Sequence, residues 1–123
     1  MQAPELASVL LGTGNPDRLR QWYIAAFGVK PRDDGWLPFG GFNMLIDGRD
    51  DVRQVNDEPG RMILNFHTDD AATLAAQIEA AGGAAWIVPL EERHDGIFGT
   101  LVDPDGNYVQ IIQLNDAYFE TRR

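Results

Sequence analysis

FGTLVDPDGNYVQIIQ, residues 98–113, decides the fold of this chain. Two stretches of β-prone residues flank the turn sequence DPDGN (103–107), in which Pro104 fixes φ and Gly106 can take a positive φ. This pattern predicts a strand, a tight turn and a second strand. The neutral amide of Gln110 falls in the middle of the second strand, where a carboxylate would indicate chemistry.

An amphipathic helix is predicted by NPDRLRQWYIAAFG, residues 15–28. Asn15 suits the N-cap, Pro16 suits the first helical position and Gly28 suits the end of the helix. Apolar side chains follow one another at helical spacing and predict a buried stripe. The stripe consists of Leu19, Trp22, Tyr23, Ala26 and Phe27.

The same order of elements recurs in the second half of the chain. Sliding the sequence on itself sets Asn15 on Asp70 and Leu19 on Leu74, with the same physical role at each pair. In each copy a strand leads into the helix, and three short extended segments follow it. The predicted strands are 6–13, 29–34, 36–40 and 42–47 in the first copy, and 62–68, 84–91, 97–103 and 107–114 in the second.

We therefore predict one α+β domain over residues 1–123, made of two β-α-β-β-β modules with mixed, curled sheets. The first module covers residues 6–48 and the second covers residues 61–114. Residues 49–60 are polar and without periodicity, which is typical of a linker.

Composition excludes several classes of function. The chain has 123 residues, a formal net charge of −9 and no cysteine. Nucleic acids and anionic membranes are not expected as partners, because binding phosphates requires clustered Lys and Arg. The absence of cysteine excludes disulfides, thiolate metal sites and cysteine nucleophiles. No apolar run is long enough to span a membrane and no signal peptide is recognisable, so we expect a cytoplasmic protein.

The two modules, the linker and the DPDGN turn together resemble the vicinal oxygen chelate superfamily, which includes glyoxalase I, bleomycin resistance proteins and extradiol dioxygenases. The resemblance covers residues 6–114 and is strongest over residues 15–28 and 98–113. It implies that the curled sheets enclose a cavity. A metal, when present, is held there by His and Glu side chains from the first and last strand of each module. Such a metal would bind two adjacent substrate oxygens and stabilise an enediolate or activate oxygen.

This chain departs from the family pattern at all four metal positions, which the resemblance places at Ser8, Asn43, Ile63 and Gln110. Ile63 cannot ligate, and three neutral oxygens would lose most of the attraction that holds a divalent ion. The DPDGN turn has the spacing of a calcium loop, but Leu114 stands where a bidentate Glu is required. We therefore predict no metal and no cofactor. Gln110 would then hydrogen-bond a ligand, or bond to Ser8 or Asn43 across the cavity floor.

The inner faces of the predicted strands favour an apolar cavity. Trp36, Phe39, Trp86 and Phe98 lie along the predicted sheets, where they would stack on a flat ligand or pack in the core. Together with the acidic balance, this indicates a small aromatic or amphiphilic ligand, including a cationic one. The predicted ligand-binding residues are Ser8, Leu10, Trp36, Asn43, Leu45, Ile63, Asn65, Tyr108 and Gln110.

Two histidines are the candidates for a catalytic general base. His67 ends a predicted strand, and the plain alternative is local pairing with Asp69. His94 lies in the loop EERHDG, where rim residues often carry function, and the plain alternative is a solvated loop side chain.

Three functions fit these observations. The first is a metal-free protein that binds a small molecule, as in the bleomycin resistance branch, where cavities commonly form between two chains; we therefore expect a homodimer. The second is a metal-independent enzyme of the same superfamily, with His94, His67 or an acidic side chain as general base. The third is a metal-dependent lyase, isomerase or dioxygenase whose metal ligands lie at other positions than in the family. The uncharged residues at the four metal positions make this the least favoured of the three.

Overall fold

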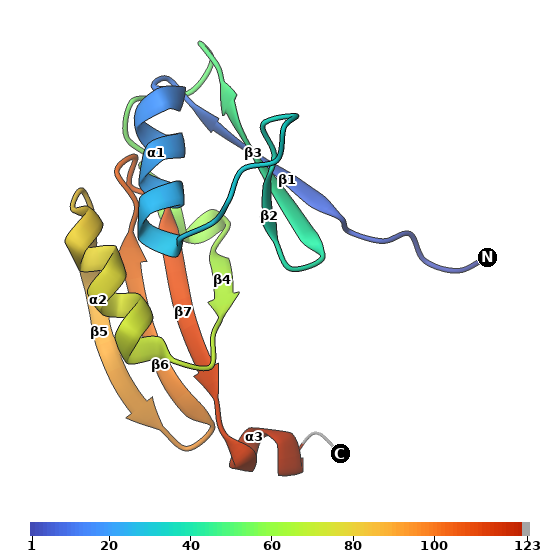
Figure 1. Ribbon diagram of the computed structural model, residues 1–123, viewed down its shortest axis with the longest axis vertical. Helices are drawn as coiled ribbons and strands as arrows, with labels where there is room; N and C mark the ends of the chain where they lie inside the picture. The colour runs from blue at the N-terminus through green and yellow to red at the C-terminus, as the bar shows by residue number, and fades with distance from the viewer. Residues whose placement is uncertain (122–123) are drawn as a thin grey trace.

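Two helices lie side by side on one face of two β-sheets in the computed structural model, which describes residues 1–121 (Figure 1). One sheet has three strands in the order β1-β3-β2, and the other has four strands in the order β4-β7-β6-β5. The strands are β1 (Ser8–Thr13), β2 (Leu37–Phe39), β3 (Phe42–Gly48), β4 (Leu64–His67), β5 (Ala85–Arg93), β6 (Gly96–Val102) and β7 (Tyr108–Leu114). The helices are α1 (Pro16–Phe27), α2 (Ala71–Ala81), α3 (Asp116–Thr121) and the 3-10 helix η1 (Pro59–Arg61). Each sheet combines parallel and antiparallel pairs, so the predicted α+β class with mixed sheets is confirmed.

The internal repeat is visible in the hydrogen bonds that start the two long helices. The side chain of Asn15 caps α1, and its own N–H donates to Oγ1 of Thr13 at 3.0 Å. The side chain of Asp70 caps α2, and its own N–H donates to Oγ1 of Thr68 at 3.1 Å. The same Thr-x-Asx arrangement thus turns a strand into a helix twice.

The first module has one strand fewer than predicted, because residues 29–34 form a loop. The N–H of Gly35 donates to the carbonyl of Arg32 at 2.9 Å, and the N–H of Arg32 donates to the carbonyl of Trp36 at 2.9 Å. Gly35 takes a φ of 92°, which a residue with a side chain rarely adopts. The turn satisfies locally the backbone groups that a strand would have offered to the sheet.

The DPDGN turn forms the predicted hairpin between β6 and β7. The N–H of Asp103 donates to the carbonyl of Asn107 at 2.9 Å, and Gly106 takes a φ of 85°. β6 and β7 then pair antiparallel from Val102 opposite Tyr108 onwards. The stretch that decided the fold in the sequence is therefore assigned correctly.

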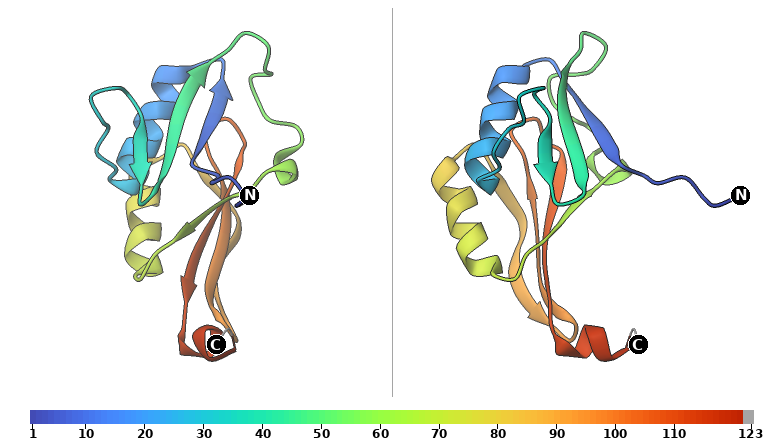
Figure 2. Two further views of the ribbon diagram at one scale, coloured as in Figure 1. Left: turned by 90° about the vertical axis from the view of Figure 1, so that its right-hand side faces the viewer. Right: turned by 45° about the vertical axis from the view of Figure 1, so that its right-hand side comes forward.

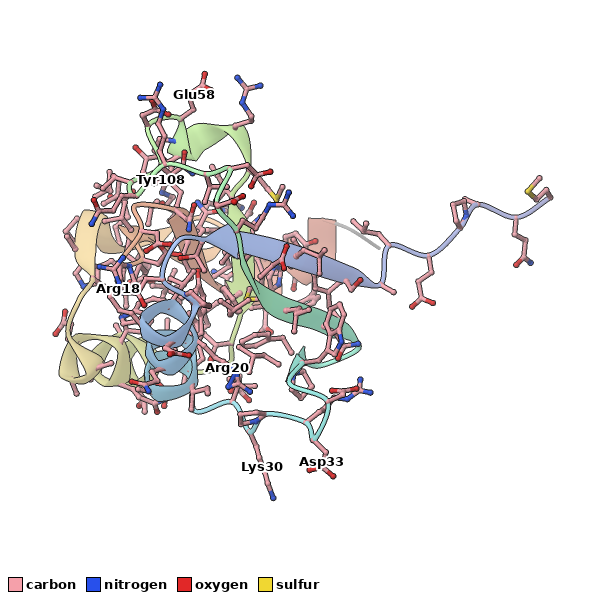
Figure 3. The ribbon with its side chains drawn as sticks, turned by 90° about the horizontal axis from the view of Figure 1, so that it is seen from above. Arg18, Arg20, Lys30, Asp33, Glu58 and Tyr108 are labelled. Atoms are coloured by element: carbon pink, nitrogen blue, oxygen red, sulfur yellow. The ribbon has the colours of Figure 1, made fainter. Side chains whose placement is uncertain are left out.

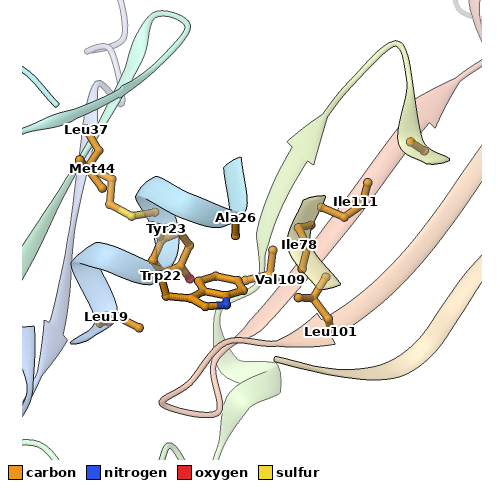
Figure 4. Packing of buried hydrophobic residues seen from close by; sticks show 11 residues of the cluster. Leu19, Trp22, Tyr23, Ala26, Leu37, Met44, Ile78, Leu101, Val109 and Ile111 are labelled. Carbon is orange, nitrogen blue, oxygen red and sulfur yellow. The ribbon is translucent and has the colours of Figure 1, made fainter. Parts of the chain in front are cut away.

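A single hydrophobic core runs through both modules (Figure 4). The stripe predicted on α1 is confirmed, with Phe27 packed partly buried against it. The buried residues of this core are Leu19, Trp22, Tyr23, Ala26, Leu37, Met44, Ala71, Ile78, Leu101, Val109 and Ile111. Because they come from both halves of the sequence, the two modules pack on each other within one chain.

Aromatic rings fill the junction between the modules. Phe27 of α1 stacks on Phe66 of β4 with 4.2 Å between ring centroids, and Phe39 of β2 meets Phe66 edge to face at 5.0 Å. Phe39 and Trp86 therefore pack on the helix side of the sheets, where they contribute to the core. Of the two alternatives predicted for these rings, packing in the core is the one that the structure shows.

Among residues 1–121, no helix is long and apolar enough to cross a membrane.

Candidate functional site

One face of each sheet is left uncovered by the helices. Val9 and Leu11 of β1 pack against the core, so the alternate residues Ser8 and Leu10 lie on the other face. Figure 2 shows the helices on one side of the sheets, while the N-terminal segment and α3 extend towards the other side. The residues predicted at the metal positions lie on this uncovered side, which we call the open face.

Two pairs of uncharged polar residues, which include three of the four predicted metal positions, lie on two different sheets. Ser8 of β1 lies opposite Asn43 of β3 in the three-stranded sheet. In the four-stranded sheet, Gln110 of β7 lies opposite Asn65 of β4, and β4 begins only at Leu64. Ile63, the predicted first-strand position, stands two residues before Asn65, just ahead of β4.

The chemistry of these four side chains does not suit a divalent metal. One hydroxyl and three carboxamides carry no charge, and a divalent ion in such a fold requires imidazole nitrogen or carboxylate oxygen. Within residues 1–121, no group of three or more His, Cys, Asp or Glu side chains is placed to hold a metal ion. We therefore derive no reaction step through a metal.

The carboxamides of the second pair are available to a ligand. Gln110 is half-buried and Asn65 is exposed. Gln110 and Ser8 lie in different sheets. The predicted alternative of a bond from Gln110 to Ser8 or Asn43 is not seen among the side-chain hydrogen bonds of the described residues.

The remaining predicted ligand-binding residues extend these two pairs. Leu10 lies opposite Leu45 and next to the Ser8–Asn43 pair along the same strands. Tyr108 stands two residues before Gln110 on β7, and Ile63 is exposed two residues before Asn65. Trp36 is half-buried and directly precedes β2. Each sheet thus presents uncharged polar groups beside apolar ones.

Of the two histidines, only His67 shares a strand and a face with these groups, two residues after Asn65. His67 is exposed at the end of β4, opposite Ile112 of β7. His94 is exposed in the turn between β5 and β6, with its Nε2 3.9 Å from Oδ1 of Asp95. A general base needs a substrate held within hydrogen-bond reach, and both imidazoles face bulk solvent.

The DPDGN aspartates make contacts between the modules that their sequence did not indicate. Asp103 and Asp105 are only 2% and 6% exposed. The hydroxyl of Tyr23 donates to Oδ2 of Asp103 at 2.7 Å, and Oγ1 of Thr13 donates to Oδ2 of Asp105 at 2.5 Å. The guanidinium of Arg18 also bonds Asp105. These bonds join the turn of the second module to β1 and α1 of the first, and we call this set of contacts the clasp.

Burial shapes the electrostatics of the clasp. Removal from water raises the pKa of the Asp103 carboxyl, although the hydrogen bonds from Asn107 and Tyr23 oppose this shift. Removal from water, with Asp103 as a negative neighbour, raises the pKa of the Tyr23 hydroxyl well above its ordinary value. The phenol therefore stays protonated and serves as a donor. The clasp is structural, because its polar groups are used by one another.

The comparisons with known proteins agree with this architecture. A family model described as a glyoxalase-like domain matches residues 8–112. No curated protein matches the chain.

Several solved structures share the fold at low sequence identity. A glyoxalase-related enzyme from Fulvimarina pelagi is 24% identical, with a TM-score of 0.69 over 90% of this chain and 88% of that one. A glyoxalase/bleomycin resistance protein/dioxygenase family enzyme from Burkholderia phytofirmans is 18% identical, with a TM-score of 0.73 over 91% of this chain and 100% of that one. A glyoxalase/bleomycin resistance protein from Albidiferax ferrireducens is 18% identical, with a TM-score of 0.65 over 89% of this chain and 98% of that one. At these identities the likeness shows the fold alone.

Proposed function

This chain belongs to the glyoxalase-like domain family, and within that family we propose that it binds a small aromatic or amphiphilic molecule on the open face of its sheets without a metal. The observation that carries the proposal is the pairing of Asn65 with Gln110 on neighbouring parallel strands. Together the two carboxamides offer four donor protons and two acceptor oxygens, so they can orient a polar edge of a ligand. An ion would require charge that these groups do not carry.

The surroundings of the pair favour an apolar body for the ligand. Tyr108 and Ile63 lie on the same side of their segments as Gln110 and Asn65, since side chains two residues apart along an extended chain share a face. A ring laid on these side chains would be held by shape and stacking. The net charge of −9 favours a neutral or cationic ring over an anionic one at this face.

We also propose that a second copy of the chain completes the site. Leu10 and Ile63 are exposed on the open face, and the pairs that include Ser8 and Gln110 lie on different sheets. A homodimer would cover these apolar side chains and bring a second set of neutral pairs to the ligand. A cytoplasmic location stays part of the proposal on the strength of the composition alone.

Binding has more support than catalysis by the histidines. His94 lies in the turn between β5 and β6, away from the Asn65–Gln110 pair. His67 stands two residues after Asn65 on the same face of β4, but its side chain is exposed to solvent. A metal-independent lyase or isomerase would need a base directed at a bound substrate.

Isothermal titration against a panel of flat aromatic molecules tests the proposal. The panel contains neutral and cationic members of matched ring size, and each titration is repeated with a metal chelator. We expect at least one member to bind, with affinity unchanged by the chelator and about tenfold weaker in Gln110→Ala. Gln21→Ala, an exposed glutamine on α1, is the matched control and should bind as the wild type does. Flat titrations across the panel, or equal affinity in Gln110→Ala, would contradict the proposal.

A further inference from the structure

The segment 49–62, which we call the strap, crosses from β3 to β4 and is fixed to both modules. The N–H of Arg49 donates to a carbonyl at the end of β1 at 2.8 Å. Further along, the N–H of Asn56 donates to the carbonyl of Asp105 at 2.8 Å, and its Nδ2 donates to Oδ1 of Asn107 at 2.9 Å. Any space beneath the strap is therefore largely formed before a ligand arrives.

Exposed apolar side chains of the strap and of β1 line one recess. Among residues 1–121, nine large hydrophobic residues are exposed, and four of them line one recess of about 560 Å³. These four are Leu10, Val52, Val55 and Met62, which are 56%, 40%, 61% and 63% exposed. The volume falls in the range of small-molecule sites, and apolar side chains that gather on a surface mark binding sites.

Two arginines stand at the rim of this recess. Arg53 lies 3.6 Å from Asp57, and Arg61 lies 2.9 Å from Glu58. Figure 3 shows Glu58 at the outer edge of the molecule, so this rim faces solvent. Exposed ion pairs of this kind contribute little, so either guanidinium can turn to a ligand at small cost. Guanidinium groups bind carboxylates and sulfonates through paired hydrogen bonds.

We propose that the recess is a second binding site, for a small amphiphile with an apolar ring or chain and one anionic head group. The apolar part would lie against Val52, Val55 and Met62, and the head group would bind Arg53 and Arg61. The net charge of −9 opposes an anion at long range, but salt screens a diffuse charge within about 10 Å, and the guanidiniums act at contact. Asn65 and Gln110 are absent from the lining of the recess, so this site differs from the one proposed above, although Leu10 borders both.

Two fluorescent probes that differ by one sulfonate test the proposal. 1-Anilinonaphthalene-8-sulfonate carries the anion, and N-phenyl-1-naphthylamine has the same rings without it. The double variant Val55→Gln/Met62→Gln should weaken the binding of both probes about tenfold, because it removes apolar contact. Arg53→Gln/Arg61→Gln should weaken only the sulfonate probe, by about tenfold. The control Ile87→Gln, which changes an exposed apolar residue of β5, should leave both probes unaffected.

Each outcome either supports the recess as a binding site or overturns it. Unchanged binding of both probes in Val55→Gln/Met62→Gln would overturn the site, and unchanged sulfonate binding in the arginine variant would overturn the anionic head group. If Val55→Gln/Met62→Gln turns a dimer into a monomer in sedimentation, the recess seats a second copy and the proposal is wrong. Thermal melting checks that each variant is folded. If the double variant does not fold, the single variant Met62→Gln changes the same side of the recess with less disruption. Loss of both probes in Gln110→Ala would instead place their binding on the open face.

Discussion

The hydroxyl of Tyr23 on α1 donates a 2.7 Å hydrogen bond to the buried carboxylate of Asp103 in the turn between β6 and β7. The two residues belong to different modules, and neither module alone contains both partners. Asp103 also accepts from the N–H groups of Asp105 and Asn107. The bond therefore fixes the position of the second module on the first while it completes the turn.

Tyr23→Phe should lower the free energy of unfolding by about 1–3 kcal/mol, because it leaves a buried carboxylate with one donor fewer. Urea denaturation followed by circular dichroism measures this loss. Tyr108→Phe is the matched control, because the hydroxyl of Tyr108 makes no hydrogen bond among the described residues, and it should change stability by less than about 0.5 kcal/mol. Equal stability of Tyr23→Phe and the wild type would show that the clasp does not hold the modules together.

Titration of the Asp103 carboxyl should contribute to the pH dependence of the free energy of unfolding. Burial raises the pKa of this carboxyl in the folded chain above its ordinary value of 3.8. A raised folded-state pKa means that the folded chain holds the proton more tightly than the unfolded chain. This contribution is fully present below pH 3.8 and is lost as the pH rises through the folded-state pKa.

Asp103→Asn isolates that contribution from those of the other carboxylates. The free energy of unfolding of the wild type, minus that of Asp103→Asn, should fall as the pH rises from 3.8 to about 7. Denaturation series at several pH values measure the difference. A difference that rises over this interval would mean that the folded chain stabilises the ionised form, and the pKa of Asp103 would then be lowered rather than raised.

Gly96, at the start of β6, should tolerate no side chain. An ideal Cβ at this position would lie 2.0 Å from the carbonyl oxygen of Gln113, and the residue takes a φ of 154°. Gly96→Ala should destabilise the chain by about 1–3 kcal/mol or more, as measured by thermal or urea unfolding. Gly60→Ala is the matched control, since a Cβ there would meet nothing within 4 Å, and it should be nearly neutral. Similar melting of the two variants would contradict this assignment of the β6–β7 register.

The helices and the last hairpin could be predicted because their signals are local. The caps at Asn15 and Asp70 and the turn glycine at Gly106 act within a few residues of themselves. The first module was predicted with one strand too many because residues 29–34 look extended, and the turn closed by Gly35 is not obvious from composition. The pairing of Asn65 with Gln110 depends on the register between β4 and β7, which the sequence of either strand alone does not specify.

The clasp and the recess could not be predicted because they depend on contacts between distant segments. Aspartates are common in turns of this type, so Asp103 and Asp105 by themselves indicate only a turn. Nothing near them in the sequence indicates that Tyr23 and Thr13 are their partners. In the sequence, Val55 belongs to a polar linker without periodicity. That it lines the same recess as Leu10 depends on the path of the strap, which the sequence does not indicate. The neutral character of the four metal positions was read directly from residue types, which need no contacts.

Metal binding to the purified chain tests the central claim most directly. After dialysis against a chelator and removal of the chelator, the protein is titrated with Zn²⁺, Ni²⁺ and Mn²⁺ in a calorimeter. Because Ser8, Asn43, Asn65 and Gln110 offer only uncharged donors, we predict no stoichiometric uptake of any of the three ions. Uptake of one ion per chain that disappears in Asn65→Ala/Gln110→Ala would contradict the claim.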